Sequence, residues 1–286
     1  MSFVPEEISL IVSSDPAAGA INKTNDGSYF EIQLDGEGIH LPKDAINVNV
    51  AVEEATVWWT IPNIITGVND LIRITGENDQ GGTGTFNIIL PQGLYDLSGL
   101  NQAIITGLEN AGALTVDGNG NSISLISLEA DDATQKVRIR FNTAQAAIYF
   151  NIGQTPREIL GFESNQYGPF PGSYPTSVLA ENTAAFNQVN YFLLHSDLVN
   201  KGIRFNNSFN QTIAQILIDV APGSQIISKP FNPAKCNGQE LAGSRRTNLR
   251  FWITDDKQRP VNTNGEYFTA RIVIHYMRPM IIGRTR

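Results

Sequence analysis

Strict alternation of apolar and polar residues is the feature of this sequence that most restricts its fold. Between 45 and 53, Ile46, Val48, Val50 and Val52 alternate with mostly polar side chains. Successive side chains of a β-strand point to opposite faces of a sheet, so a period of two predicts half-buried strands. By similar patterns we also predict strands at 8–12, 30–34, 189–194, 212–220, 226–229, 248–254 and 267–277.

Composition agrees with a chain built from strands and turns. Only 17% of the 286 residues are charged, and Asn, Gly, Ser, Thr and Pro fill the gaps between short apolar runs. The single cysteine, Cys236, excludes an internal disulfide and fits maturation in a reducing compartment. The N-terminus resembles no secretory signal and no apolar run is long enough to span a bilayer, so we expect a soluble, unsecreted protein.

The pattern changes after Pro62. Short strands are predicted at 70–75 and 84–90, and then one helix, in which Leu97, Leu100, Ile104 and Leu108 recur at helical spacing. A hairpin is predicted from 122–128 and 136–141, followed by a helical turn that ends at Leu160–Gly161. The segment 163–187 holds three prolines and is predicted to be a linker or long loop.

These patterns together predict an all-β protein, an eight-stranded single jelly-roll sandwich with an inserted α+β domain. Three strands precede the central segment and five follow it, which suits the two-sheet, Greek-key winding of a jelly roll. The predicted domains are 1–61 and 188–286 for the sandwich and 62–187 for an inserted outer domain.

Charge is distributed unevenly along the chain. Residues 200–286 hold 13 Lys and Arg against 5 Asp and Glu, whereas residues 1–199 hold 7 against 23. The basic excess is spread over several strands and a tail, so it indicates a basic edge that meets an acidic partner and no specific nucleic-acid binding. The candidate subunit or capsid contacts are Arg245, Arg246, Arg250, Arg278, Arg284 and Arg286.

Three tryptophans are further candidates. Trp58, Trp59 and Trp252 could stack on sugars or bases, but packing in the core or at a subunit interface is the commoner use of tryptophan in a β-sandwich. We therefore predict aromatic interface or core residues at these positions.

The residues of catalysis and metal binding are sparse. His40, His195 and His275 do not lie at ligand spacing, and Cys236 has no cysteine partner, so we predict no metal and no cofactor. His195 and Asp197 would share a strand face, but no nucleophile elbow accompanies them, and a hydrogen bond that ends a strand is the favoured interpretation. Residues 117–121 imitate a calcium loop but lack its later ligands, and a hairpin turn explains them. We predict no enzyme.

Four stretches carry a resemblance to a known family. They are LPQGLYDLSGLNQAI and PREILGF in the central segment, then YFLLHSDLVN, and finally LRFWITDDKQRPVNTNGEYFTARIVIHYMRP. Over roughly 85–286 the chain resembles the penton, or vertex minor capsid, proteins of polinton-like viruses and virophages, in the adenovirus and tailless-phage lineage.

The resemblance implies a structural protein of the virion. It implies a jelly roll with an inserted outer domain, assembled inside the host cell as a homo-pentamer at icosahedral vertices, with the major capsid protein as partner and a possible host receptor contacted by the inserted domain. The Arg-Gly-Asp triplet of adenovirus pentons is missing here. The alternative is a carbohydrate- or receptor-binding β-sandwich module of a phage fibre or baseplate, because fold does not fix function.

Overall fold

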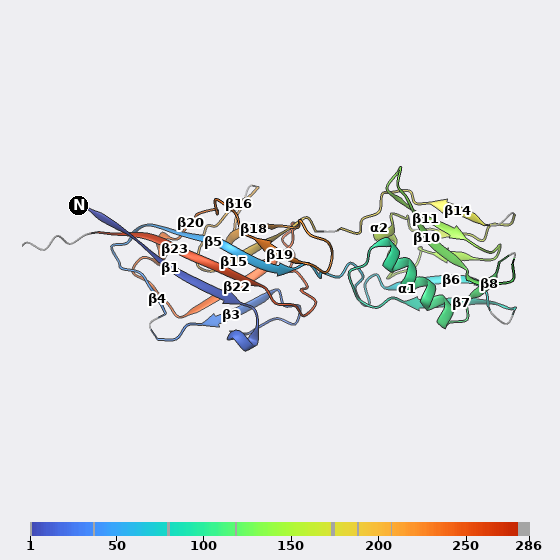
Figure 1. Ribbon diagram of the computed structural model, residues 1–286, viewed down its shortest axis with the longest axis horizontal. Helices are drawn as coiled ribbons and strands as arrows, with labels where there is room; N and C mark the ends of the chain where they lie inside the picture. The colour runs from blue at the N-terminus through green and yellow to red at the C-terminus, as the bar shows by residue number, and fades with distance from the viewer. Residues whose placement is uncertain are drawn as a thin grey trace, which may run out of the picture. The chain divides into compact units, whose positions relative to one another are not determined.

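The chain divides into two compact units in a computed structural model (Figure 1). One unit joins Met1–Ile61 to Val189–Arg286, and the other is Pro62–Gln188. The structure describes residues 2–36, 38–78, 81–117, 119–172, 175–187, 189–206 and 208–279. We call the first unit the sandwich and the second the insert, and describe each by itself.

Two five-stranded antiparallel sheets form the sandwich. Sheet A has the order β1-β23-β5-β19, and β20 also pairs with β5. Its strands are β1 (Phe3–Ser13), β23 (Thr269–Pro279), β5 (Ile46–Trp58), β19 (Gln225–Ser228) and β20 (Cys236–Asn237). Sheet B has the order β18-β15-β22-β3-β2. Its strands are β18 (Thr212–Leu217), β15 (Tyr191–Ser196), β22 (Asn248–Thr254), β3 (Tyr29–Gln33) and β2 (Ala20–Ile21).

The pairing order is that of a jelly roll. In chain order the main strands are β1, β3, β5, β15, β18, β19, β22 and β23. The first pairs with the last, the second with the seventh, the third with the sixth and the fourth with the fifth, as in a long hairpin. Winding this hairpin adds the contacts of β23 with β5 and of β22 with β15. The insert lies in the chain between the third and fourth of these strands.

The prediction of an all-β jelly roll is confirmed, and its eight predicted strands correspond to the eight main strands. Each sheet gains one short strand, β2 beside β3 and β20 beside β5. β19 and β20 pair with different parts of the same long strand, at Ala55–Trp58 and at Asn49–Val50 respectively. Two-residue strands carry no alternation, so the pattern of the sequence did not indicate them. Further short elements of the sandwich are β4 (Ile39–His40), β16 (Arg204–Phe205), β17 (Ser208–Phe209), β21 (Arg245–Arg246), η1 (Pro16–Ala18) and η2 (Gln239–Leu241).

The core of the sandwich lies between its sheets. Phe30 of β3 is fully buried, and its ring lies 5.4 Å from that of Phe251 and 5.2 Å from that of Phe268. Alternate residues of the predicted strand at 267–277 point into this core, because Phe268, Ala270, Ile272, Ile274 and Tyr276 are all buried.

The insert contains a four-stranded sheet, a three-stranded sheet and one long helix. The four-stranded sheet is β13 (Gln166–Tyr167), β12 (Ala147–Tyr149), β6 (Leu71–Glu77) and β7 (Thr83–Ile89). The three-stranded sheet is β10 (Ile126–Asp131), β11 (Lys136–Phe141) and β14 (Thr176–Leu179), and β8 (Leu114–Val116) pairs with β9 (Ser122–Ser124).

The predicted helix is confirmed as α1 (Leu97–Asn110). Asp96 caps its start, because the Asp96 carboxylate accepts a hydrogen bond from the Gly99 N–H at 2.6 Å. The helix contacts β7 and β10, and buries Leu100, Ile104 and Leu108. A Cβ on Gly107 would lie 2.3 Å from the Ile88 side chain, so glycine permits this close approach to β7. The short helix α2 (Arg157–Leu160) ends at Gly161, as predicted.

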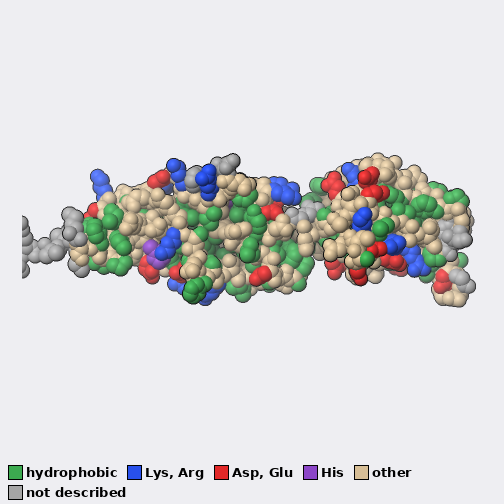
Figure 2. All heavy atoms as spheres, turned by 90° about the horizontal axis from the view of Figure 1, so that it is seen from above, with side chains coloured by type: hydrophobic (Ala, Val, Ile, Leu, Met, Phe, Trp, Pro, Cys, Tyr) green, Lys and Arg blue, Asp and Glu red, His purple; other side chains and the backbone are tan. Residues whose placement is uncertain are grey.

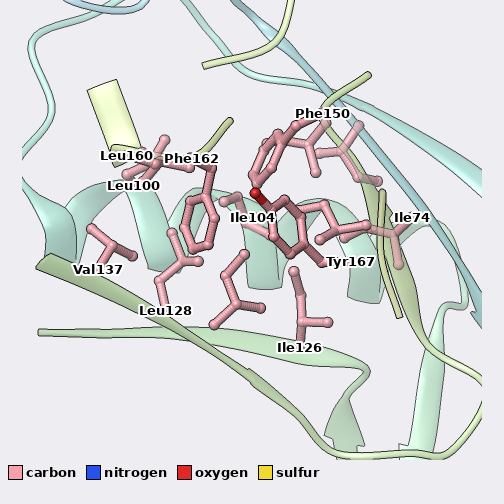
Figure 3. Packing of buried hydrophobic residues seen from close by; sticks show 14 of the residues in the cluster. Ile74, Leu100, Ile104, Ile126, Leu128, Val137, Phe150, Leu160, Phe162 and Tyr167 are labelled. Carbon is pink, nitrogen blue, oxygen red and sulfur yellow. The ribbon is translucent and has the colours of Figure 1, made fainter. Parts of the chain in front are cut away.

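One apolar cluster fills the insert (Figure 3). Phe150 and Phe162 stack at 5.2 Å, and the ring of Tyr167 packs edge-on against both. Leu100 and Ile104 join this cluster from the helix, together with residues of β10 and β11. The insert thus has a closed core of its own.

The prediction that 163–187 is a linker or long loop is wrong. Residues 166–167 form β13 and pair with β12, and residues 176–179 form β14 and pair with the edge of β11. Tyr167 and Ala180 are buried in the cluster of the insert. The prolines do break the segment, but two sheet edges with open hydrogen-bonding groups recruit the short runs between them.

Candidate functional site

A row of polar and aromatic side chains crosses the outer face of sheet B. In β22, Leu249, Phe251 and Ile253 are buried toward the core, so Arg250 and Trp252 point to the opposite face. Strand register places Trp252 between Tyr29 of β3 and His195 of β15. His195 is in turn paired with Thr212 of β18. Residues from four strands that are distant in sequence therefore form one surface.

His195 is the buried member of this row. Its Nε2 lies 2.8 Å from Thr254 Oγ1 and its Nδ1 3.1 Å from Thr212 Oγ1. The imidazole and the Trp252 ring are parallel, with centroids 5.3 Å apart. Burial lowers the pKa of His195 to about 4, so the ring is neutral near pH 7. Asp197 instead accepts a hydrogen bond from the Arg250 backbone N–H at 3.0 Å, which supports a structural interpretation of the His195 and Asp197 pair.

Glu31 organises the polar end of the same face. Its carboxylate accepts hydrogen bonds from the Tyr29 hydroxyl, from Asn22 at 3.0 Å and from Asn248 at 3.1 Å, and lies 3.6 Å from Arg250 Nε. These hydrogen bonds lower the pKa of Glu31 to about 2, and the bond from Tyr29 has the largest effect. Burial and the neighbouring carboxylate raise the pKa of Tyr29 to about 12. The contacts with Glu31 hold Tyr29 and Arg250 beside Trp252.

A pocket of about 600 Å³ opens above this row. The strands contribute Tyr29, Arg250 and Trp252 to its wall. Loops that precede and follow the strands contribute Asp26, Asp197, Gln211 and Pro260. The sequence had indicated Arg250 and Trp252 separately, and the structure brings them together here.

The other predicted arginines lie apart from this pocket. Arg245 and Arg246 form β21, which pairs with β4, and Arg245 Nη2 donates to Gly36 O at 3.0 Å. Arg278 lies near the end of β23, 3.6 Å from Glu6 of β1. Arg284 and Arg286 lie outside the described residues. Their role as subunit contacts stays a prediction.

The remaining tryptophans occupy two environments at the end of β5. Trp59 is buried, and its backbone N–H donates to Ser224 O at 3.0 Å. Trp58 is 36% exposed, on the neighbouring position of the same segment. Trp59 is thus a core residue, whereas Trp58 is open to solvent.

Several residues of the pocket, from loops and from β3, were missed by the sequence interpretation. Asp26, Tyr29 and Gln211 line the pocket, yet none belongs to a motif. The alternation of β3 could have indicated Tyr29, because it lies on the same outward-facing side of the strand as Glu31. No local sequence pattern identifies the loop residues as part of a pocket.

Acid should destabilise the sandwich through His195. Its pKa in the fold is about 4, below the usual 6.5, so protons bind the unfolded chain more readily and stability is lost as pH falls from about 6.5 toward 4. Between pH 7 and 5 we expect His195 to account for a loss of about 2 kcal/mol in unfolding free energy. Urea unfolding of the parent and of His195→Gln at both pH values measures this, and an equal pH dependence in the two proteins would contradict it.

The described residues contain no group of three or more His, Cys, Asp or Glu that could hold a metal ion. They also contain no helix with the length and apolar character needed to cross a membrane.

The fold and the site define a jelly-roll protein with an inserted second unit and a pocket on one sheet. No protein-family model matches the sequence, and no curated protein matches it either. Among solved structures, the chain is similar to the mavirus penton protein, with 10% identity, a TM-score of 0.45 and coverage of 95% of this chain and 99% of that one. It is also similar to a chain in the cryo-EM structure of the Sputnik virophage, with 14% identity, a TM-score of 0.42 and coverage of 95% and 98%.

Proposed function

We propose that this chain is a structural protein of a viral capsid, a penton subunit that assembles as a pentamer at icosahedral vertices. The observation that carries the proposal is the jelly-roll strand order with a closed second unit inserted in one connection. The resemblance of four sequence stretches to vertex capsid proteins leads to the same arrangement. The major capsid protein is the partner that would surround such a ring.

The outer edge of sheet A supports a role in assembly. β1 is an edge strand of 11 residues, and no described strand pairs with its other side. Long open edges recruit further strands, and native proteins cover or block them. A contact with the next subunit would cover this edge, since ring-forming contacts join different surfaces of successive copies.

The register of β1 shows which groups this edge offers. Ser14 N–H bonds to Phe268 O at 3.0 Å, in continuation of the β1–β23 register, so even-numbered residues of β1 bond to β23. The backbone groups of Glu7, Ser9 and Ile11 therefore point to the open side, and the Ile11 side chain is 81% exposed. Pro5, which has no N–H, lies at the same open side, where proline is tolerated.

The insert differs from the sandwich in charge. Residues 62–188 hold 12 Asp and Glu against 5 Lys and Arg, so they carry a net charge of −7 out of −8 for the whole chain. Acidic side chains are frequent on the face of the insert that Figure 2 shows. We propose that the insert faces outward from the vertex, where this charge would favour basic surfaces and a receptor contact.

Electron microscopy of the full chain, alone and bound to capsids, tests the proposal. We expect rings with fivefold symmetry. Ser9→Pro removes one N–H from the open edge of β1 and should weaken ring formation while leaving thermal unfolding close to that of the parent, as Pro5 is already accepted there. Ser9→Ala keeps the N–H and is the matched control.

The possible outcomes separate the edge contact from the function. Rings formed by Ser9→Pro as readily as by the parent would exclude the β1 edge as a subunit contact. A full-length protein that forms no fivefold ring, either alone or on capsids, would overturn the penton proposal.

A further inference from the structure

The pocket above sheet B has the size of a site for a small ligand. Its volume of about 600 Å³ lies within the range of about 300–1,000 Å³ of ligand pockets. The strands and loops that form it belong to the sandwich alone, so no part of the insert is needed. It lies on the outer face of the sheet, away from the core.

An aromatic side chain forms one wall. The partly exposed indole of Trp252 lines the pocket, and the parallel ring of His195 holds it in place. His195 is itself fixed by Thr254 and Thr212. A tryptophan held rigidly in this way offers a flat apolar surface without loss of side-chain freedom on binding.

Hydrogen-bonding groups surround this aromatic wall. Asp26 Oδ1 accepts bonds from Thr24 Oγ1 at 2.6 Å and from Ser28 N at 2.9 Å, and Asp197 Oδ1 accepts from Arg250 N at 3.0 Å. Among the described residues, Oδ2 of each carboxylate accepts no hydrogen bond. Two pre-oriented acceptors are therefore available to hydroxyl donors.

The charges of the pocket select against an anion. Its charged side chains are Asp26, Asp197 and Arg250, and Arg250 already lies 3.6 Å from Glu31. Hydrogen bonds from Thr24 and Ser28 outweigh burial and lower the pKa of Asp26, so this carboxylate is ionised at neutral pH. A negatively charged group would meet more acid than base.

We propose that this pocket binds a neutral pyranose, one sugar unit of a glycan. The apolar C–H face of the ring would stack on Trp252, and its hydroxyls would donate to Asp26 and Asp197 and accept from Arg250. A pyranose has an apolar face that suits the Trp252 ring and a rim of hydroxyls that suits the carboxylates of Asp26 and Asp197. All residues of this site belong to the sandwich, whereas the family resemblance implied a receptor contact by the insert.

Saturation-transfer NMR with the full chain tests the inference. The probes are the methyl glycosides of galactose, glucose and mannose at millimolar concentration, with N-acetylneuraminic acid as the anionic contrast. We expect transfer to at least one neutral glycoside and weaker or no transfer to the acid. Trp252→Ala should weaken binding about tenfold or more. Trp58→Ala is the matched control, because it removes an exposed tryptophan of sheet A, and it should leave binding unchanged.

A second variant guards against misfolding. Trp252→Phe keeps a ring against His195 but reduces the stacking surface, so it should retain the thermal unfolding of the parent and still bind several-fold more weakly. The inference is overturned if no neutral glycoside shows transfer, if the acid binds best, or if Trp58→Ala reduces binding as much as Trp252→Ala does. These results do not depend on ring formation, so they are distinct from a failure of the proposed capsid function.

Discussion

Replacing Phe30 by alanine is expected to lower the free energy of unfolding of the sandwich by about 3–5 kcal/mol. The side chain is fully buried, and its ring contacts Phe251 from the neighbouring strand and Phe268 from the segment before β23. Truncation removes the apolar surface of Phe30 from the core and leaves a cavity between two rings, which the paired strands cannot easily close.

The measurement uses an optical signal that belongs to one unit. All three tryptophans, at 58, 59 and 252, lie in the sandwich, so tryptophan fluorescence during urea unfolding reports on that unit. Phe231→Ala is the control, since Phe231 is 97% exposed and should change stability by less than about 0.5 kcal/mol. A loss below about 1 kcal/mol for Phe30→Ala would show that the two sheets repack around the gap or do not enclose this ring as described.

Replacing Asn63 by alanine is expected to destabilise the insert by more than about 2 kcal/mol. Asn63 is buried, and its Nδ2 donates to Tyr95 O at 2.7 Å and to Phe186 O at 3.2 Å, while Oδ1 accepts from Tyr95 N at 2.9 Å. One side chain thus joins the beginning and the end of the insert to the segment before α1. Alanine would leave three backbone groups without these partners. A buried donor or acceptor that lacks a partner costs more free energy than a typical hydrogen bond contributes to stability.

The helical signal of far-UV circular dichroism measures this change, because α1 belongs to the insert. Asn87→Ala is the control, since Asn87 is exposed and its Oδ1 accepts a hydrogen bond from Arg73 Nε at 2.8 Å on the surface of the insert. Unchanged stability of Asn63→Ala would mean that water replaces the amide in solution.

The two substitutions together test the proposed division into domains. Phe30→Ala should shift the fluorescence transition alone, and Asn63→Ala should shift the helical transition alone, if each unit folds on its own core. If either substitution shifts both transitions equally, the two units unfold as one.

The local pattern of the sequence was sufficient for the elements and for the faces they bury. Alternation predicted the main strands of the sandwich, and helical spacing predicted the buried stripe of α1. Both follow from side-chain periodicity, which is the same wherever the element is placed in the fold.

Local pattern was not sufficient where a segment takes its structure from a distant partner. Residues 176–179 became a strand because the edge of β11 lies beside them, and the short β2 and β20 formed against longer strands. The linker prediction for 163–187 failed for this reason. Hydrogen bonds to a neighbouring strand stabilise these short segments, and the residues of the segments do not indicate that such a neighbour is present.

The sequence by itself determined that this chain is built of strands, with one helix and apolar faces to bury, because each of these depends on residues a few positions apart. Only the tertiary structure decided which strands pair and what gathers on their outer faces. The pocket joins residue 24 to residue 260, and Trp252 meets Tyr29 and His195 through strand register. Such contacts form only when the jelly roll folds, and they cannot be predicted from the charge or periodicity of the separate segments.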